Sequence, residues 1–168
     1  MNQKKSQPIY LVVVGAGNAS LEIYALARQV GKEAARRGWV VVTGGLSGVM
    51  EGTCRGACEE GGLTLGILPG GERNQANPYV QIAVATQMQH ARNAVIAHTA
   101  DALIAVDGEY GTLSEVALGL KLGKPVVGLH SPWTVSGLIR AENPAEAIEK
   151  VASLLEGRAD RKTSGSNG

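Results

Sequence analysis

Phenylalanine is absent from this 168-residue chain, and aromatic residues of all kinds make up only 4% of it. Because large rings are so scarce, the core has to be built from valine, isoleucine, leucine and alanine, as in parallel strands covered by helices. An excess of one charge is also missing: the formal net charge is +1, which argues against a nucleic-acid or membrane partner. The length fits one domain, large enough to bury a core that needs no disulfide or metal to stabilise it.

Cysteine occurs only twice, at Cys54 and Cys58, four residues apart in a segment with helical spacing. Since no further cysteine or nearby histidine completes a site, we interpret them as free thiols packed on one helix face and expect no metal. No signal peptide precedes Ile9, and no apolar run is long enough to span a bilayer. These absences lead us to expect a cytoplasmic protein.

Glycine is abundant, with 23 residues, and it separates short apolar runs from segments of helical spacing. The apolar runs predict strands at 9–14, 39–43, 63–68, 80–84, 102–106 and 125–129. Helical spacing covers 21–37, 49–60, 87–99, 112–122 and about 144–155. This alternation predicts a three-layer α/β/α sandwich around a mainly parallel sheet. We expect residues 1–156 to form a single domain and residues 157–168 a disordered tail.

The first glycine turn, Gly15-Ala-Gly17-Asn18-Ala-Ser20, ends the first expected strand and opens a helix. A dinucleotide fingerprint would lie here, but Ser20 replaces its third glycine and the second strand ends without an acid for a ribose. A nicotinamide-dependent dehydrogenase is therefore disfavoured. The turn is either a tight connection capped by Ser20 or a contact for a phosphate or ribose.

The turn after the second expected strand, Thr43-Gly44-Gly45-Leu46-Ser47-Gly48, repeats this design. Its glycines allow the backbone to approach a phosphate closely, and Ser47 can add a hydroxyl donor. The alternative is a plain tight crossover. Two such turns at neighbouring strand ends favour a shared anion site, because open α/β sheets bind ligands at that edge.

A third turn, Asp107-Gly108-Glu109-Tyr110-Gly111-Thr112, leads from the fifth expected strand into a helix. The N–H groups of Gly111 and Thr112 would point at an anion there. Thr112 to Glu115 also matches the capping box S/T-x-x-E, in which the glutamate bonds the backbone of the threonine. Glu115 is thus either a helix cap or a carboxylate that contacts a ribose or polarises a leaving group.

Arg92 shares its expected helix face with the apolar residues Met88, Val95 and Ile96. A guanidinium on that face must either extend along its stem to solvent or pair with an anion, and phosphate would suit its geometry. Asn93 beside it could orient a hydroxyl. The three histidines lack metal-ligand spacing, and we find no arrangement typical of nucleophilic catalysis.

Three segments together resemble one superfamily: Thr43-Gly-Gly-Leu-Ser-Gly-Val-Met-Glu-Gly52, Arg92-Asn93 and Gly108-Glu-Tyr-Gly-Thr-Leu-Ser-Glu115. They are similar to the Rossmann-like group that contains the molybdenum-cofactor carrier proteins, the Lonely Guy phosphoribohydrolases and, more distantly, the DNA-processing protein DprA. The likeness spans 9–155, and the segments 66–70 and 77–79 look most like the small bacterial branch near the carriers. It implies a Rossmann-like, nucleotide-binding domain and a homodimer or homotetramer, with helices 87–99 and 112–122 packed between subunits.

The hydrolases of this group carry Pro-Gly-Gly-x-Gly-Thr-x-x-Glu after a helix with an arginine. By resemblance, Arg92 and Glu115 would be their catalytic pair, and the phosphate of a nucleoside monophosphate would be held by Gly45, Ser47, Gly48, Gly111 and Thr112. The chain departs from the pattern at Asp107 and at Glu109, which replaces the second glycine. An acid beside a phosphate site favours a carrier that binds its ligand without turnover.

We therefore expect a protein that binds a phosphorylated heterocycle, either a nucleotide or a molybdopterin-type cofactor, and that requires no other cofactor. The alternative is a nucleoside 5′-monophosphate phosphoribohydrolase, which releases a free base and ribose 5-phosphate. The expected ligand contacts are Gly15, Gly17, Asn18, Gly44, Gly45, Ser47, Gly48, Arg92, Asn93, Gly108, Gly111, Thr112 and Glu115.

Overall fold

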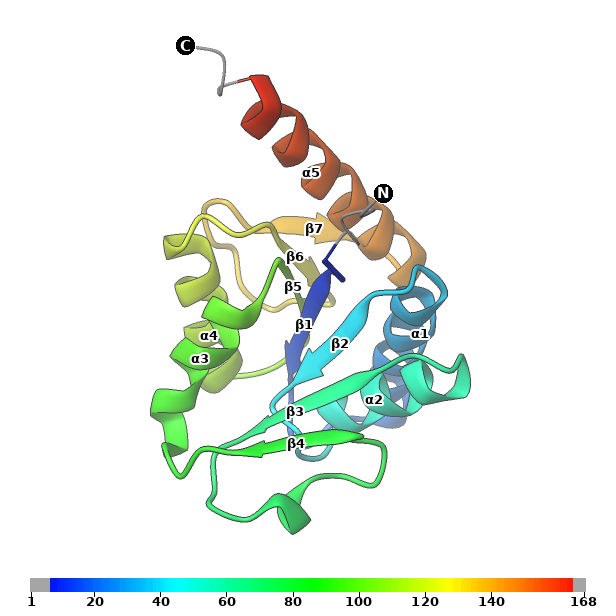
Figure 1. Ribbon diagram of the computed structural model, residues 1–168, viewed down its shortest axis with the longest axis vertical. Coiled ribbons are helices and arrows are strands. Elements are labelled where there is room, and N and C mark those ends of the chain that lie inside the picture. The colour runs from blue at the N-terminus through cyan, green and yellow to red at the C-terminus, as the bar shows by residue number, and fades with distance from the viewer. Residues whose placement is uncertain (1–6, 165–168) are drawn as a thin grey trace, which may run out of the picture.

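A seven-stranded sheet forms the centre of the computed structural model, which describes residues 7–164 (Figure 1). The strands are β1 (Tyr10–Gly15), β2 (Val40–Thr43), β3 (Thr64–Leu68), β4 (Ile82–Ala85), β5 (Ala102–Val106), β6 (Val126–Leu129) and β7 (Ile139–Ala141). They pair in parallel in the order β4-β3-β2-β1-β5-β6-β7. The predicted Rossmann-like sandwich is confirmed.

Helices cover both faces of the sheet (Figure 1). They are α1 (Leu21–Arg36), α2 (Val49–Glu59), α3 (Arg92–Thr99), α4 (Tyr110–Lys121) and α5 (Pro144–Ser164), with short 3-10 helices η1 (Arg73–Gln75) and η2 (Gln89–Ala91). Buried residues of α1, α2 and α5 pack on one face, and those of α3 and α4 on the other. Because the connections between parallel strands must cross over the sheet, helices cover both of its faces and exclude water from them.

The core is aliphatic, as the shortage of aromatic residues predicts. Successive residues of β1 point to opposite faces: Leu11 and Val13 join the cluster under α1, while Val12 and Val14 join the cluster under α3. All four are almost completely buried. Trp39 is the one aromatic side chain in the buried core of residues 7–164.

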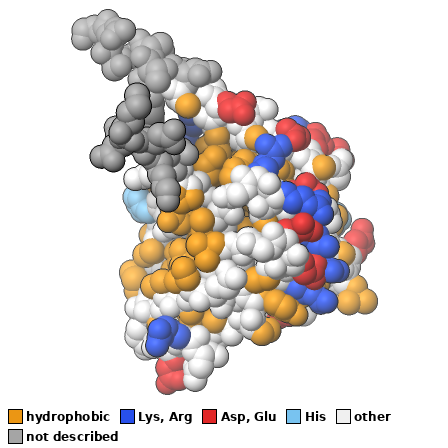
Figure 2. All heavy atoms as spheres, turned by 45° about the vertical axis from the view of Figure 1, so that its right-hand side comes forward, with side chains coloured by type: hydrophobic (Ala, Val, Ile, Leu, Met, Phe, Trp, Pro, Cys, Tyr) orange, Lys and Arg blue, Asp and Glu red, His pale blue; other side chains and the backbone are white. Residues whose placement is uncertain are grey.

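The face over α1 and α2 carries interleaved positive and negative side chains (Figure 2). Ion pairs link the two helices, Arg28 to Glu59 and Arg36 to Glu60, each at 2.8 Å. Exposed pairs of this kind contribute little stability. They do distribute the charges so that this face has no excess of one sign.

The predicted element bounds differ from the observed ones mainly late in the chain. Strand β7 has only three residues and was not predicted, because it is too short to show a pattern. The last helix continues to Ser164, so 157–164 is helical where the sequence predicts a disordered tail. Strong helix formers flank Gly157, which by itself costs a helix only about 1 kcal/mol. Residues 165–168 of that tail lie outside the described part of the chain.

Three glycine turns meet at the carboxyl edge of the sheet because the central strands are parallel. Strand β1 lies between β2 and β5, and Gly15 is the register partner of Val106. The turns that follow these three strands therefore lie side by side. Within residues 7–164, no helix has the length and apolarity needed to cross a bilayer.

Candidate ligand-binding site

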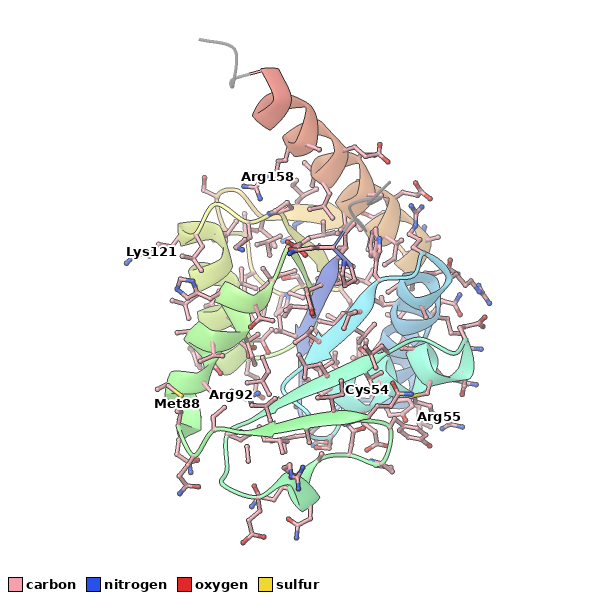
Figure 3. All side chains as sticks on the ribbon, viewed as in Figure 1. Cys54, Arg55, Met88, Arg92, Lys121 and Arg158 are labelled. Carbon is pink, nitrogen blue, oxygen red and sulfur yellow. The ribbon has the colours of Figure 1, made fainter. Side chains whose placement is uncertain are left out.

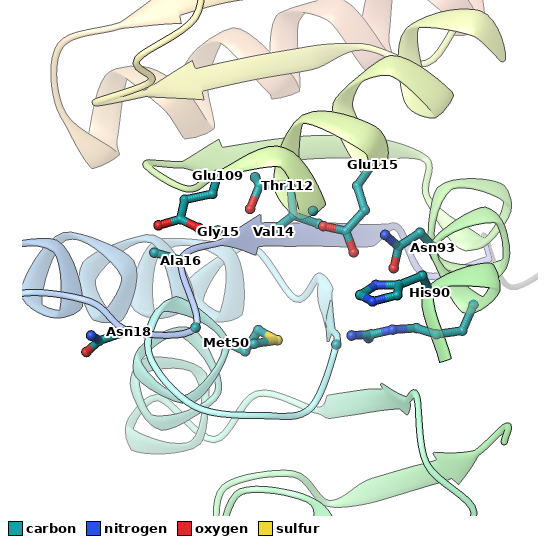
Figure 4. A pocket seen from close by; sticks show the side chains of 14 residues that line it. Val14, Gly15, Ala16, Asn18, Met50, His90, Asn93, Glu109, Thr112 and Glu115 are labelled. Carbon is teal, nitrogen blue, oxygen red and sulfur yellow. The ribbon is translucent and has the colours of Figure 1, made fainter. Parts of the chain in front are cut away.

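A pocket of about 320 Å³ lies where the turns after β1 and β2 meet the starts of α3 and α4 (Figure 4). Its volume is at the lower end of the range for small-molecule sites. The residues that line it are Val14, Gly15, Ala16, Gly17, Asn18, Gly44, Met50, His90, Arg92, Asn93, Glu109, Gly111, Thr112 and Glu115.

Most of the predicted contact residues line this pocket, and some do not. Those that line it are Gly15, Gly17, Asn18, Gly44, Arg92, Asn93, Gly111, Thr112 and Glu115. Gly45, Ser47, Gly48 and Gly108 lie outside its lining. Val14, Ala16, Met50, His90 and Glu109 line it without having been predicted as contacts. Val14, Ala16, Met50 and Glu109 lie in or next to the three turns, and His90 lies in η2, two residues before Arg92. These positions were the only signal for them.

Arg92, the first residue of α3, lies between that helix and the carboxyl end of β3 (Figure 3). Only 8% of its surface is exposed, so the alternative of a side chain extended to solvent is wrong. One Nη donates a hydrogen bond of 2.6 Å to the carbonyl oxygen of Ile67. A side chain at Gly44 would collide with the same guanidinium, because its Cβ would come within 2.3 Å of Nη1.

The guanidinium of Arg92 is not fully satisfied by the protein. Its Nε is buried and has no hydrogen-bond partner among the described residues. Burial lowers the pKa of Arg92, and the nearby charge of Glu115 counteracts this in part. A buried cation with a spare donor and only a neutral carbonyl as hydrogen-bond partner is costly unless an anion joins it.

Glu115 lies in the second turn of α4 and is 8% exposed. The helix begins at Tyr110 after the N-cap Glu109, because Leu113 donates its N–H to the Glu109 carbonyl. Thr112 is therefore inside the first turn, and the predicted alternative of a Thr112–Glu115 capping box is wrong. The Glu115 carboxylate points into the pocket (Figure 4).

Burial raises the pKa of Glu115 to about 7, and the charge of Arg92 offsets only part of this rise. No ion pair or hydrogen bond joins Glu115 to Arg92 in the described structure. Neutral and ionised forms are therefore both populated near neutral pH. Such a carboxyl group in a pocket is a candidate for a functional role.

Asn93 positions the beginning of α4. Its Nδ2 donates to Ser114 Oγ at 2.9 Å, and that hydroxyl donates to the Gly111 carbonyl oxygen at 2.7 Å. Gly108 acts on the same segment: its φ is +111°, and a Cβ there would come within 2.4 Å of Thr112 Oγ1. Asn93 and Gly108 thus fix where the N–H groups of Gly111 and Thr112 point.

The turn after β2 is used for packing against the turn after β1. Ser47 Oγ donates to the Gly17 carbonyl oxygen at 2.8 Å, and Gly45 N–H donates to Thr43 Oγ1 at 3.0 Å. A Cβ at Gly48, which has a φ of +66°, would come within 2.2 Å of the Ala16 carbonyl oxygen. Gly45, Ser47 and Gly48 thus serve local packing and lie outside the pocket lining, whereas Gly44 of the same turn lines the pocket.

The cysteines and histidines form no metal site in the part of the chain that the structure describes. No three His, Cys, Asp or Glu side chains gather there in a group that could hold an ion. Cys54 and Cys58 are free thiols, as predicted. Burial raises the pKa of Cys54 to about 11, so it remains protonated and unreactive.

Comparison with known proteins assigns the chain to a family. The SLOG cluster4 family model matches residues 8–156. The chain belongs to the SLOG cluster4 family. An uncharacterized protein from Archaeoglobus fulgidus is 46% identical to it over 136 residues, which cover 81% of this chain and 89% of that relative.

Solved structures share the fold of this SLOG cluster4 protein over most of its length. The molybdenum cofactor binding protein of Rippkaea orientalis is 35% identical with a TM-score of 0.84, covering 89% of this chain and 98% of that one. The molybdenum cofactor carrier protein of Chlamydomonas reinhardtii is 34% identical with a TM-score of 0.82, covering 89% and 99%. The resemblance to this superfamily is confirmed.

Proposed function

We propose that this SLOG cluster4 protein binds a phosphorylated heterocycle, a molybdopterin-type cofactor or a nucleotide, in the pocket at the carboxyl edge of its sheet. The observation that carries the proposal is the buried Arg92, which lines the pocket and whose guanidinium has only a neutral carbonyl oxygen as its hydrogen-bond partner in the described chain. The relatives from Rippkaea and Chlamydomonas, described as binding or carrying the molybdenum cofactor, support it.

The phosphate is best accommodated between Arg92 and the start of α4. The first N–H groups of a helix have no partner within it, and they carry partial positive charge. Those of Gly111 and Thr112 belong to residues on the pocket wall. Together with Arg92, whose planar donors match phosphate oxygens, they supply several donors for one anion.

Binding of mononucleotides to the full chain tests this proposal. Titration calorimetry with GMP and AMP should give saturable binding to the wild type. Because a hydrogen bond to a charged group is lost, Arg92→Met should weaken binding on the order of 10- to 100-fold. Arg73→Met, a change of an exposed arginine outside the pocket, is the matched control. Equal affinity of Arg92→Met and wild type, with both folded by circular dichroism, would rule out the proposed site.

The second candidate function is that of a phosphoribohydrolase. It is favoured because Glu115 does not cap a helix and its carboxyl group is available to a ligand. An ionised Glu115 could stabilise a ribosyl cation, while its raised pKa leaves a neutral fraction at pH 7 that cannot. Release of ribose 5-phosphate from nucleoside monophosphates, abolished in Glu115→Gln, would replace simple binding as the function. Binding without release would exclude the hydrolase for those substrates.

We also propose a homo-oligomer, as the resemblance implies. Met88 and Val95, both in the segment 87–99, are 44% and 36% exposed, although they are apolar. Burial against a second copy would remove this exposed apolar surface from water. Light scattering after gel filtration should give at least a dimer, and Val95→Glu should shift it towards the monomer. A monomeric wild type at micromolar concentration would contradict this.

A further inference from the structure

Glu109 places a second carboxylate on the pocket wall, and nothing in the protein uses it. It is exposed and is the N-cap of α4, yet its side chain makes no capping hydrogen bond. Among the side chains of residues 7–159, no lysine, arginine or histidine forms an ion pair with it. In the pocket it lies beside Gly15 and Ala16, away from His90 and Asn93 at the other end (Figure 4).

Arg92 and the unused Glu109 carboxylate therefore lie at opposite ends of the pocket. The end near α3 holds the cation of Arg92, with the carboxyl group of Glu115 close enough to interact with its charge. The end near Gly15 holds the Glu109 carboxylate, which accepts hydrogen bonds and repels anions. A ligand that fills both ends must present an anion to Arg92 and N–H donors to Glu109.

A carboxylate has two oxygens side by side and accepts two parallel N–H donors best. The 2-amino-4-oxo pyrimidine edge shared by guanine and pterin rings offers such a pair: the ring N–H and the neighbouring amino group. Hypoxanthine keeps the ring N–H and lacks the amino group. Adenine presents an acceptor nitrogen beside its amino group, so it pairs with a carboxylate less well.

We infer that Glu109 recognises the heterocycle and that the pocket selects a ring with a 2-amino-4-oxo edge, bound with its phosphate towards Arg92. This inference rests on the proposed function, since it assigns the other end of the same ligand. The inference explains why Glu109 stands where the hydrolase pattern has a glycine. A carboxylate at this position repels a phosphate but can accept hydrogen bonds from the ring N–H and the neighbouring amino group.

A purely structural role of Glu109 would have a different signature. A negative charge at a helix N-terminus stabilises the helix by interaction with its dipole. Loss of that effect would change the free energy of unfolding and would alter the affinities of related ligands equally. Selectivity between two ligands that differ by one amino group therefore separates recognition from helix stabilisation.

The test is titration calorimetry of GMP and IMP with the wild type, Glu109→Gln and Glu72→Gln, in buffer with EDTA. Glu72 is an exposed glutamate outside the pocket and provides the matched control. Since the amino group donates to a charged acceptor, the wild type and the control should bind GMP on the order of 10- to 100-fold more tightly than IMP. Glu109→Gln should lower GMP affinity to that of IMP and leave IMP affinity nearly unchanged.

Three outcomes would overturn the inference. Equal affinities of wild type for GMP and IMP would show no selection for the amino group. A preference that persists in Glu109→Gln would assign it to another residue. Absence of any mononucleotide binding would overturn both this inference and the mononucleotide form of the proposed function. Binding that depends on Arg92 but shows no preference would leave the proposed function intact.

Discussion

The turns after β2 and β5 have similar sequences, but most of the first packs inside the protein and the second faces the pocket. Both are rich in glycine, and both lead from a buried parallel strand into a helix. In the turn after β2, Ser47 and Gly48 make their contacts with the backbone of the turn after β1. In the turn after β5, Glu109 and Gly111 face the pocket. In the turn after β2 only Gly44 lines the pocket, whereas the turn after β5 presents a carboxylate without a protein partner to it.

The largest expected effect comes from adding one methyl group to each turn. Gly48→Ala should destabilise the fold by about 3 kcal/mol or more, because the residue has a positive φ and its Cβ would overlap the Ala16 carbonyl oxygen. A Cβ at Gly111 would point into open space, so Gly111→Ala should stay within about 0.5 kcal/mol of wild type. Urea unfolding followed by circular dichroism measures both.

The difference between the two glycines also predicts different functional outcomes. Gly111→Ala should fold normally and weaken GMP binding, since its new methyl group would lie at the pocket wall. If Gly48→Ala instead proved as stable as wild type, the close packing of the two turns would not be required for folding.

The second effect concerns the pH dependence of stability and arises from Glu115 in α4, the helix that follows the turn after β5. Because the pKa of Glu115 rises from 4.5 to about 7 on folding, the folded state holds its proton more tightly than the unfolded state. The stabilisation is complete below pH 4.5 and is lost as pH rises through 7, a difference of about 3 kcal/mol. Glu115→Gln should abolish this dependence, so that at pH 8.5 the variant unfolds at higher urea concentration than wild type. Glu72→Gln should leave the pH profile unchanged.

A third, smaller effect links protons to the ligand. A phosphate near Arg92 favours neutral Glu115, because two negative groups in one pocket repel each other. Affinity for GMP should therefore fall as pH rises above 7, by up to about tenfold per pH unit. Calorimetry at pH 8 in buffers of different ionisation enthalpy should show proton uptake on binding. Uptake that persists in Glu115→Gln would assign the proton to another group.

The sequence predicts the sheet well because buried parallel strands are continuous apolar runs. Strand β5 matches its predicted range of 102–106, whereas β7, with three residues at the sheet edge, shows no such run. The local sequence does not decide the role of Glu115, because the same four residues are compatible with a capping box and with a carboxylate in a pocket. That choice depends on the residue at which α4 begins. The contacts of Gly108 and Asn93 position the start of α4, and these two residues lie outside the Thr112–Glu115 segment.

The smallest effect compares one hydroxyl group in each turn. Ser47→Ala removes the hydrogen bond to the Gly17 carbonyl oxygen and should cost about 1 kcal/mol of stability without changing GMP affinity. Ser114→Ala should cost a similar amount, about 1 kcal/mol, and also weaken binding. Its hydroxyl joins Asn93 to the Gly111 carbonyl, so its loss frees the start of α4 to move. Urea unfolding and calorimetry on both variants measure the two quantities separately. If Ser47→Ala weakened binding as much as Ser114→Ala, the assignment of Ser47 to packing alone would be wrong.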